Sequence, residues 1–169
     1  MEAELELVQR AKQGDTAAFA KLYETVYQDL YRFALYTLKN PHDAQDAVSD
    51  TVADAFAGIR KLRAEEAFRA WIFKILSNKC RRKLKEYVRR AQELTEEPEG
   101  CSAYVGMDEQ AVVRSLFFEL SYEERMILAM HLFGGYTSRE MAAVLHMNEN
   151  TIRSRQNRAL KKMSERYWD

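Results

Sequence analysis

The chain has 169 residues, 47% of them hydrophobic, and its 26 basic side chains balance 26 acidic ones. An acidic N-terminus, two cysteines, three scattered histidines and no apolar run near the roughly 20 residues of a membrane span exclude a signal peptide, a disulfide framework and a membrane helix. With only two prolines, six glycines and no alternating strand pattern, we expect an all-α cytoplasmic protein that needs neither a metal nor another cofactor.

The N-terminal half contains four predicted helices. The first is short, and Asp15 can cap the second, in which apolar residues recur at helical spacing over 19–38. Asn40 is the predicted N-cap of the third helix and Pro41 its first residue. One face of this third helix is acidic, at Asp43, Asp46, Asp50 and Asp54. Taken alone, such a face is a solvated surface.

The fourth predicted helix, residues 66–90, becomes strongly basic after an apolar first half. Together with the loop at 61–66 it holds 11 Lys and Arg against 3 Asp and Glu. A basic run is often only a solvated face, but this density favours phosphate contacts. Phe68 and Trp71 lie in the apolar stripe and are predicted to be core, so the loop and Asn78 are better placed to reach exposed bases.

A glutamate-rich stretch without helical periodicity, residues 91–107, predicts a flexible acidic linker. It divides the chain into two small helical domains, residues 1–90 and 108–169. Asp108 is the predicted N-cap of the first helix in the second domain. A capping box that starts at Ser121 begins the next helix, which a pair of glycines ends.

Residues 137–158 have the pattern of a helix-turn-helix, which often places its second helix in the major groove of DNA. Thr137 and Glu140 form a capping box for the first helix. His146 stands in the turn where glycine is common, at a position that needs a left-handed backbone. The outward face of the second helix carries residues of the types that read DNA. They are Asn150, Arg153, Ser154, Asn157 and Arg158. Capped helix pairs with a basic face also occur as bundle corners, so DNA binding is one of two interpretations.

Four motifs, in this order, resemble the extracytoplasmic-function (ECF) sigma factors of bacterial RNA polymerase, a sigma-70-like family. They are Asp43-Ala-Gln-Asp46 through Phe56, Phe68-Arg-Ala-Trp71 through Asn78, Leu120-Ser-Tyr-Glu-Glu-Arg125, and Thr151-Ile-Arg-Ser-Arg155 with Arg158-Ala159. The resemblance spans almost the whole chain. It implies a promoter-specificity factor rather than an enzyme, monomeric when free, with core RNA polymerase, promoter DNA and an anti-sigma factor as partners.

The same resemblance assigns roles to regions and residues. Residues 1–90 would be region 2, which docks on the polymerase and opens the minus-10 element, and residues 108–169 would be region 4, which reads the minus-35 element. Docking is implied for Asp43, Gln45, Asp46, Ser49, Asp50 and Phe56. Minus-10 contacts are implied for Lys61, Leu62, Arg63, Asn78, Lys79 and Arg82. Minus-35 contacts are implied for Arg139, Asn150, Arg153, Ser154, Arg155, Asn157 and Arg158, with Arg155 equally suited to brace the fold.

This sequence departs from the family pattern at a few of these positions. Gln45 stands where Glu is frequent, and Ser49-Asp50 replaces a frequent Gln-Glu pair, so the docking surface is altered but still acidic. Asn157 occupies a place that is often hydrophobic or aromatic, which affects the expected base preference.

Two further functions remain open at the level of sequence. A stand-alone helix-turn-helix regulator would ordinarily dimerise to span two half-sites, and no heptad pattern for a dimer is present. A helical module could instead bind protein alone through its acidic and basic faces. An enzyme is not expected, because no nucleophile–base grouping, phosphate-binding glycine loop or H-E-x-x-H pattern occurs.

Overall fold

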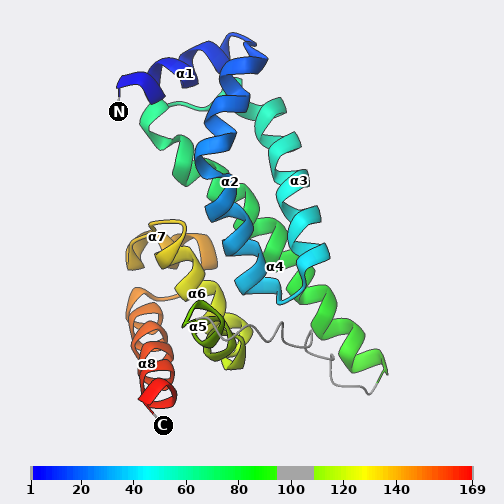
Figure 1. Cartoon of the computed structure of the whole chain (residues 1–169), viewed down its shortest axis with the longest axis vertical. Helices are drawn as coiled ribbons and strands as arrows, with labels where there is room; N and C mark the ends of the chain where they lie inside the picture. The colour runs from blue at the N-terminus through cyan, green and yellow to red at the C-terminus, as the bar shows by residue number, and fades with distance from the viewer. Residues whose placement is uncertain (1, 95–108, 169) are drawn as a thin grey trace.

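The computed structural model describes residues 2–94 and 109–168, and every regular element in that part of the chain is helical. The N-terminal unit comprises α1 (Glu2–Lys12), α2 (Thr16–Leu38), α3 (Pro41–Gly58), the 3₁₀ turns η1 (Ile59–Lys61) and η2 (Glu65–Ala67), and α4 (Phe68–Leu94). The C-terminal unit comprises α5 (Glu109–Glu119), α6 (Tyr122–Leu132), α7 (Ser138–Leu145) and α8 (Glu149–Trp168). The all-α prediction is confirmed (Figure 1).

Local sequence signals set most helix starts. Asp15 accepts a hydrogen bond from the Ala18 amide at 3.0 Å, and Asn40 accepts one from the Asp43 amide at 3.1 Å, so both predicted N-caps are confirmed. The prediction for the fourth helix was inexact. α4 begins two residues later, after a 3₁₀ turn, and runs four residues beyond Arg90, because residues 91–94 are good helix formers. The rest of the predicted linker and Asp108 lie outside the described residues.

The N-terminal bundle is built around α2, which packs against α1, α3 and α4. Leu22, Leu30 and Phe33 are fully buried on α2, and the Phe33 ring meets Phe73 of α4 edge-on at 5.8 Å. Phe68 is also buried and Trp71 packs half-buried against the same core, as the sequence predicted. This packing places the basic end of α4 beside α3.

The C-terminal unit contains the predicted helix-turn-helix. Both capping boxes are complete, with Ser121 and Thr137 as the N-caps of α6 and α7. His146 adopts the left-handed conformation at φ 54°, which ends α7 and turns the chain into α8. Gly135, at φ 68°, makes the corresponding turn after α6. α8 therefore packs directly against α7, as a helix-turn-helix requires.

The two units pack against each other through α2 and α6, a contact that the sequence did not predict. Tyr36 of α2 lies against Phe117, Phe118 and Phe133, with ring centroids 4.9, 5.9 and 5.2 Å away. Arg125 of α6 donates a hydrogen bond to the Thr37 carbonyl at 3.3 Å. Seven consecutive residues of α6, from Glu124 to Met130, are buried, because α2 covers one side and α8 another.

Candidate nucleic-acid and polymerase interfaces

The outer face of α8 carries most of the predicted minus-35 residues. Ile152 and Ala159 are fully buried against the rest of the unit. The opposite side exposes Asn150, Arg153, Ser154, Asn157 and Arg158, and Arg139 is exposed on α7. Arg153 pairs with Glu149 one turn earlier, at 2.6 Å. This exposed set combines cations with amide and hydroxyl groups, the chemistry that reads base edges and phosphates.

Arg155 differs from its neighbours on α8. Its side chain is half-buried and forms an ion pair with Glu123 of α6. Lys162, two turns further along, pairs with Glu124 at 2.7 Å. Burial alone would raise the pKa of Glu124, but the hydrogen bonds from Lys162 and Ser121 hold it below its usual value. Of the two roles considered for Arg155, the geometry favours bracing α8 against α6.

Part of the basic charge on α4 is neutralised by α3. Lys79 pairs with Asp54 at 2.6 Å, and its side chain is only 11% exposed. Lys83 pairs with Asp43 at 3.0 Å, and the Tyr87 hydroxyl donates a hydrogen bond to the same carboxylate. Burial would raise the pKa of Asp43, but these two donors outweigh it and lower that pKa. The exposed residues of α4 that can face solvent or DNA include Lys74, Asn78, Arg82 and Lys85.

The predicted minus-10 loop, residues 61–66, overlaps two 3₁₀ turns, so that only residues 62–64 lie between η1 and η2. Lys61 and Arg63 are exposed on either side of Leu62, which is only 5% exposed and belongs to the core. A pocket beside this loop is lined on one side by Trp71 and Lys74 of α4. Tyr136, Glu140, Ala143 and Val144 of the C-terminal unit line the other side. Leu62 therefore anchors the loop through its buried side chain.

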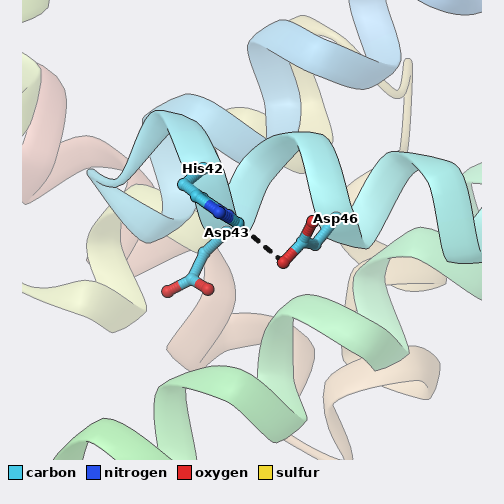
Figure 2. Close-up of side chains that lie close together, drawn as sticks. All are labelled: His42, Asp43 and Asp46. Atoms are coloured by element: carbon cyan, nitrogen blue, oxygen red, sulfur yellow. Dashed lines mark ion pairs between the residues drawn. The ribbon is translucent and has the colours of Figure 1, made fainter.

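The helix α3 lies on the side of the N-terminal bundle away from α5 to α8 (Figure 1). Gln45, Asp46, Ser49 and Asp50 are exposed there, and Phe56 is 45% exposed with its ring edge-on to Phe19. His42 pairs with Asp46 at 3.3 Å, whereas the Asp43 carboxylate points away from this pair (Figure 2). An exposed aromatic ring among polar and acidic groups is typical of a protein-binding surface.

His42, Asp43 and Asp46 each offer a ligand atom within 4.8 Å of one another. The spacing of cysteines and histidines in the sequence indicates no metal site, whereas one helical turn brings His42 beside two carboxylates. We assign no metal here. The Asp43 carboxylate already accepts from Lys83 and Tyr87, and the other two side chains are open to water.

Cys80 is fully buried on α4, and burial raises the pKa of its thiol to about 12. A thiol in that environment stays protonated and unreactive near neutral pH. Among the described helices none is long and apolar enough to cross a bilayer.

Comparison with protein families decides the identity of the chain. A model described as Sigma-70 region 2 matches residues 22–92, and one described as Sigma-70, region 4 matches residues 108–163. The chain belongs to the sigma-70 family. The first range runs from within α2 to within α4, and the second covers α5 to α7 and most of α8, so this sigma factor holds one region in each unit.

Relatives of the sigma factor place it in the ECF group. The ECF RNA polymerase sigma factor SigM of Mycobacterium tuberculosis is 27% identical over 93% of this chain and 81% of its own length. The RNA polymerase sigma factor SigV of Bacillus subtilis is 26% identical over 91% of this chain and 93% of its own. Members of this family are promoter-specificity factors, which initiate transcription without being enzymes.

Solved structures share its fold. CnrH, solved in complex with the cytosolic domain of CnrY, superposes with a TM-score of 0.68 at 27% identity, covering 96% of both chains. The sigma factor RpoE of Bartonella quintana, solved with the anti-sigma factor NepR, gives a TM-score of 0.69 at 24% identity over 87% of this chain and 94% of that one.

The structural roles of several residues of this sigma factor could not be predicted from the sequence. Asp54 and Tyr87 hold the basic helix, and Arg125 and Tyr36 join the two units. Their partners are at least 25 residues away in sequence, so motif spacing does not identify them. The only hint is the periodicity of carboxylates and lysines, which recur at steps of three and four on two predicted helices.

Proposed function

We propose that the N-terminal unit docks on core RNA polymerase through α3 and opens the minus-10 element, while the C-terminal unit reads the minus-35 element through α8. One observation carries the proposal. The exposed basic surfaces lie on different units, on α8 and on the loop and α4, and the acidic face of α3 stays uncovered by the C-terminal helices. A bipartite DNA interface with a separate docking face suits a polymerase subunit.

At the minus-35 element, Arg153, Ser154, Asn157 and Arg158 would contact base edges or phosphates, with Arg139 and Asn150 at the margin of the interface. At the minus-10 element, Lys61, Arg63, Asn78 and Arg82 are exposed and would contact the opened strand. Lys79 and Leu62 would act indirectly, because one is paired with Asp54 and the other is core. Unstacking a base costs a few kcal/mol, which contacts with the captured base must offset.

Docking would use the exposed part of the predicted set on α3: Gln45, Asp46, Ser49, Asp50 and Phe56. Asp43 would contribute mainly by orienting α4, because its carboxylate is already hydrogen-bonded. In this role the protein is a non-enzymatic subunit, monomeric when free, that acts with the polymerase in the cytoplasm.

An anti-sigma factor is the further partner that we propose. A groove between the two units has an apolar lining with basic residues beside it. It is formed by Leu84, Val88, Met126, Ile127, Leu145 and Met147, and Arg81, Lys85, Tyr122 and Glu123 complete the lining. The structural relative CnrH was solved bound to a protein domain. An amphipathic helix with acidic flanks would fit this groove.

The test is run-off transcription with purified core polymerase, with and without this protein, on a pool of genomic promoters. We expect new start sites whose promoters share two sequence elements, minus-35 and minus-10, at a constant distance from each other. If no new start site appears, and the protein instead binds a duplex operator tightly without polymerase, it is a stand-alone helix-turn-helix regulator and the proposal fails.

A further inference from the structure

We propose that α1 positions the minus-10 loop, and that the ion pair between Lys12 and Glu65 transmits its support. The inference rests on the base-capturing role proposed above for this loop. It assigns positioning residues, in contact with the loop and not with DNA.

The placement of α1 is the first observation. α1 precedes the segment 22–92 that matches Sigma-70 region 2, yet it is firmly packed, with Val8 and Ala11 only 0% and 3% exposed. It contacts both η1 and η2, the two turns that flank residues 62–64. Figure 1 shows α1 lying across the end of the bundle, directly beside the connection from α3 to α4.

The second observation is the polar contact between α1 and η2. Lys12 Nζ lies 2.8 Å from Glu65 Oε1, and the two side chains are 24% and 28% exposed. The hydrogen bond from Lys12 also lowers the pKa of Glu65, so the carboxylate is charged at neutral pH. Glu65 is the first residue of η2, and the pair therefore holds the end of the loop against α1.

The third observation is that α1 is itself fixed to the bundle. Two guanidinium nitrogens of Arg10 donate to the Asp15 carboxylate at 3.0 and 2.7 Å, and Asp15 in turn caps α2. Gly14, at φ +99°, makes the turn between these helices, and the Arg60 guanidinium of η1 lies 3.3 Å from where a β-carbon would be. The turn between α1 and α2 is therefore fixed, and this part of the bundle contacts the loop at both of its ends.

These contacts leave a loop of defined shape. Leu62 is anchored in the core while Lys61 and Arg63 stay exposed beside it. A loop that is ordered before binding loses less conformational entropy when it captures a base. The support from α1 should therefore help strand opening more than it helps later steps.

The test compares Lys12→Met with the wild type and core polymerase on two templates. One is a duplex promoter identified by the run-off experiment, and the other is the same promoter with the minus-10 element already opened by mismatches. Because a partly exposed ion pair makes a modest contribution, we expect Lys12→Met to reduce initiation about threefold on the duplex and to change it little on the opened template. A fluorescent base analogue in the minus-10 element should report unstacking reduced by the same factor.

Charge reversal separates positioning from general stability. Lys12→Glu should lose activity on the duplex but not on the opened template, which a general loss of stability would not produce, and combining it with Glu65→Lys should restore activity on the duplex. Lys21→Met removes the same charge from an exposed site on α2 and should behave as wild type. Three outcomes would overturn the inference. Lys12→Met could have wild-type activity on both templates, it could lose the same fraction of activity on both, or the variant with both charges reversed could fail to recover.

Failure of the inference about α1 can be distinguished from failure of the proposed function. A wild-type protein that starts no transcripts refutes the proposed function itself. An active wild type with an unaffected Lys12→Met variant refutes only the role of α1.

Discussion

Asp43 illustrates how one residue can match a family motif and still have a structural task. Its place in the acidic motif implied docking on polymerase. In the structure its carboxylate is shared by Lys83 and Tyr87, which joins the start of α3 to the basic half of α4. Helical spacing shows which face a carboxylate occupies, but not which helix packs against that face.

We expect Tyr87→Phe to lower the free energy of unfolding by about 1 kcal/mol at neutral pH, because a hydrogen bond to a charged group is lost. The pKa of Asp43 is lowered in the folded state, so this stabilisation is complete above the ordinary carboxyl pKa and is lost as the pH falls through the folded value. Urea unfolding at neutral and acidic pH measures both effects. Tyr27→Phe, at an exposed site on α2, is the matched control. A deficit that persists unchanged at acidic pH would contradict the assignment to Asp43.

Asp46 belongs to the same motif, and its side chain remains accessible to a partner. It is exposed, and its neighbour His42 is exposed as well. Asp46→Arg should weaken binding to core polymerase by about tenfold or more, since reversing a charge at a docking surface creates repulsion. Fluorescence anisotropy with labelled protein measures the affinity for core polymerase. Glu24→Arg makes the same charge change on α2, and a similar loss there would show that only net charge matters.

At the scale of elements, the sequence predicted what local chemistry decides. The N-caps at Asp15 and Asn40, the capping boxes and the left-handed turn at His146 depend on residues within four positions of one another, and the structure confirms them. The basic faces could be predicted only in part. Whether an arginine on α8 faces solvent or α6 depends on how the helices cross, and this separates Arg155 from Arg153.

This difference gives a prediction for α8. Arg155→Ala should lower the free energy of unfolding by about 1 kcal/mol, because Glu123 loses its partner. Arg158→Ala should leave unfolding unchanged and reduce transcription from a promoter that carries the minus-35 element. Thermal melting and run-off assays on both variants measure this, and Lys161→Ala, further along the exposed face, controls for loss of one positive charge. Stability losses in the reverse order would refute the division of roles.

At the scale of the whole molecule, the chain was expected to form two domains joined by a flexible linker. The structure adds a direct contact between them, in which Tyr36 meets three phenylalanine rings and Arg125 is buried against the Thr37 carbonyl. Burial lowers the pKa of Arg125 to about 10, so the guanidinium stays charged at neutral pH. Stripe residues such as Phe117 look like the core of their own unit in sequence, because periodicity cannot show which neighbour covers an apolar face.

Tyr36→Ala should separate the two units while leaving each folded. The variant removes three ring contacts, each worth about 0.5–1.5 kcal/mol beyond the buried area, and leaves the N-caps and internal cores of both units unchanged. We expect a larger radius of gyration by small-angle X-ray scattering, with helix content unchanged by circular dichroism. Tyr27→Ala alters an exposed tyrosine on the same helix and should keep the wild-type dimensions. Unchanged dimensions in Tyr36→Ala would mean that other contacts, such as the hydrogen bond from Arg125, suffice to hold the units together.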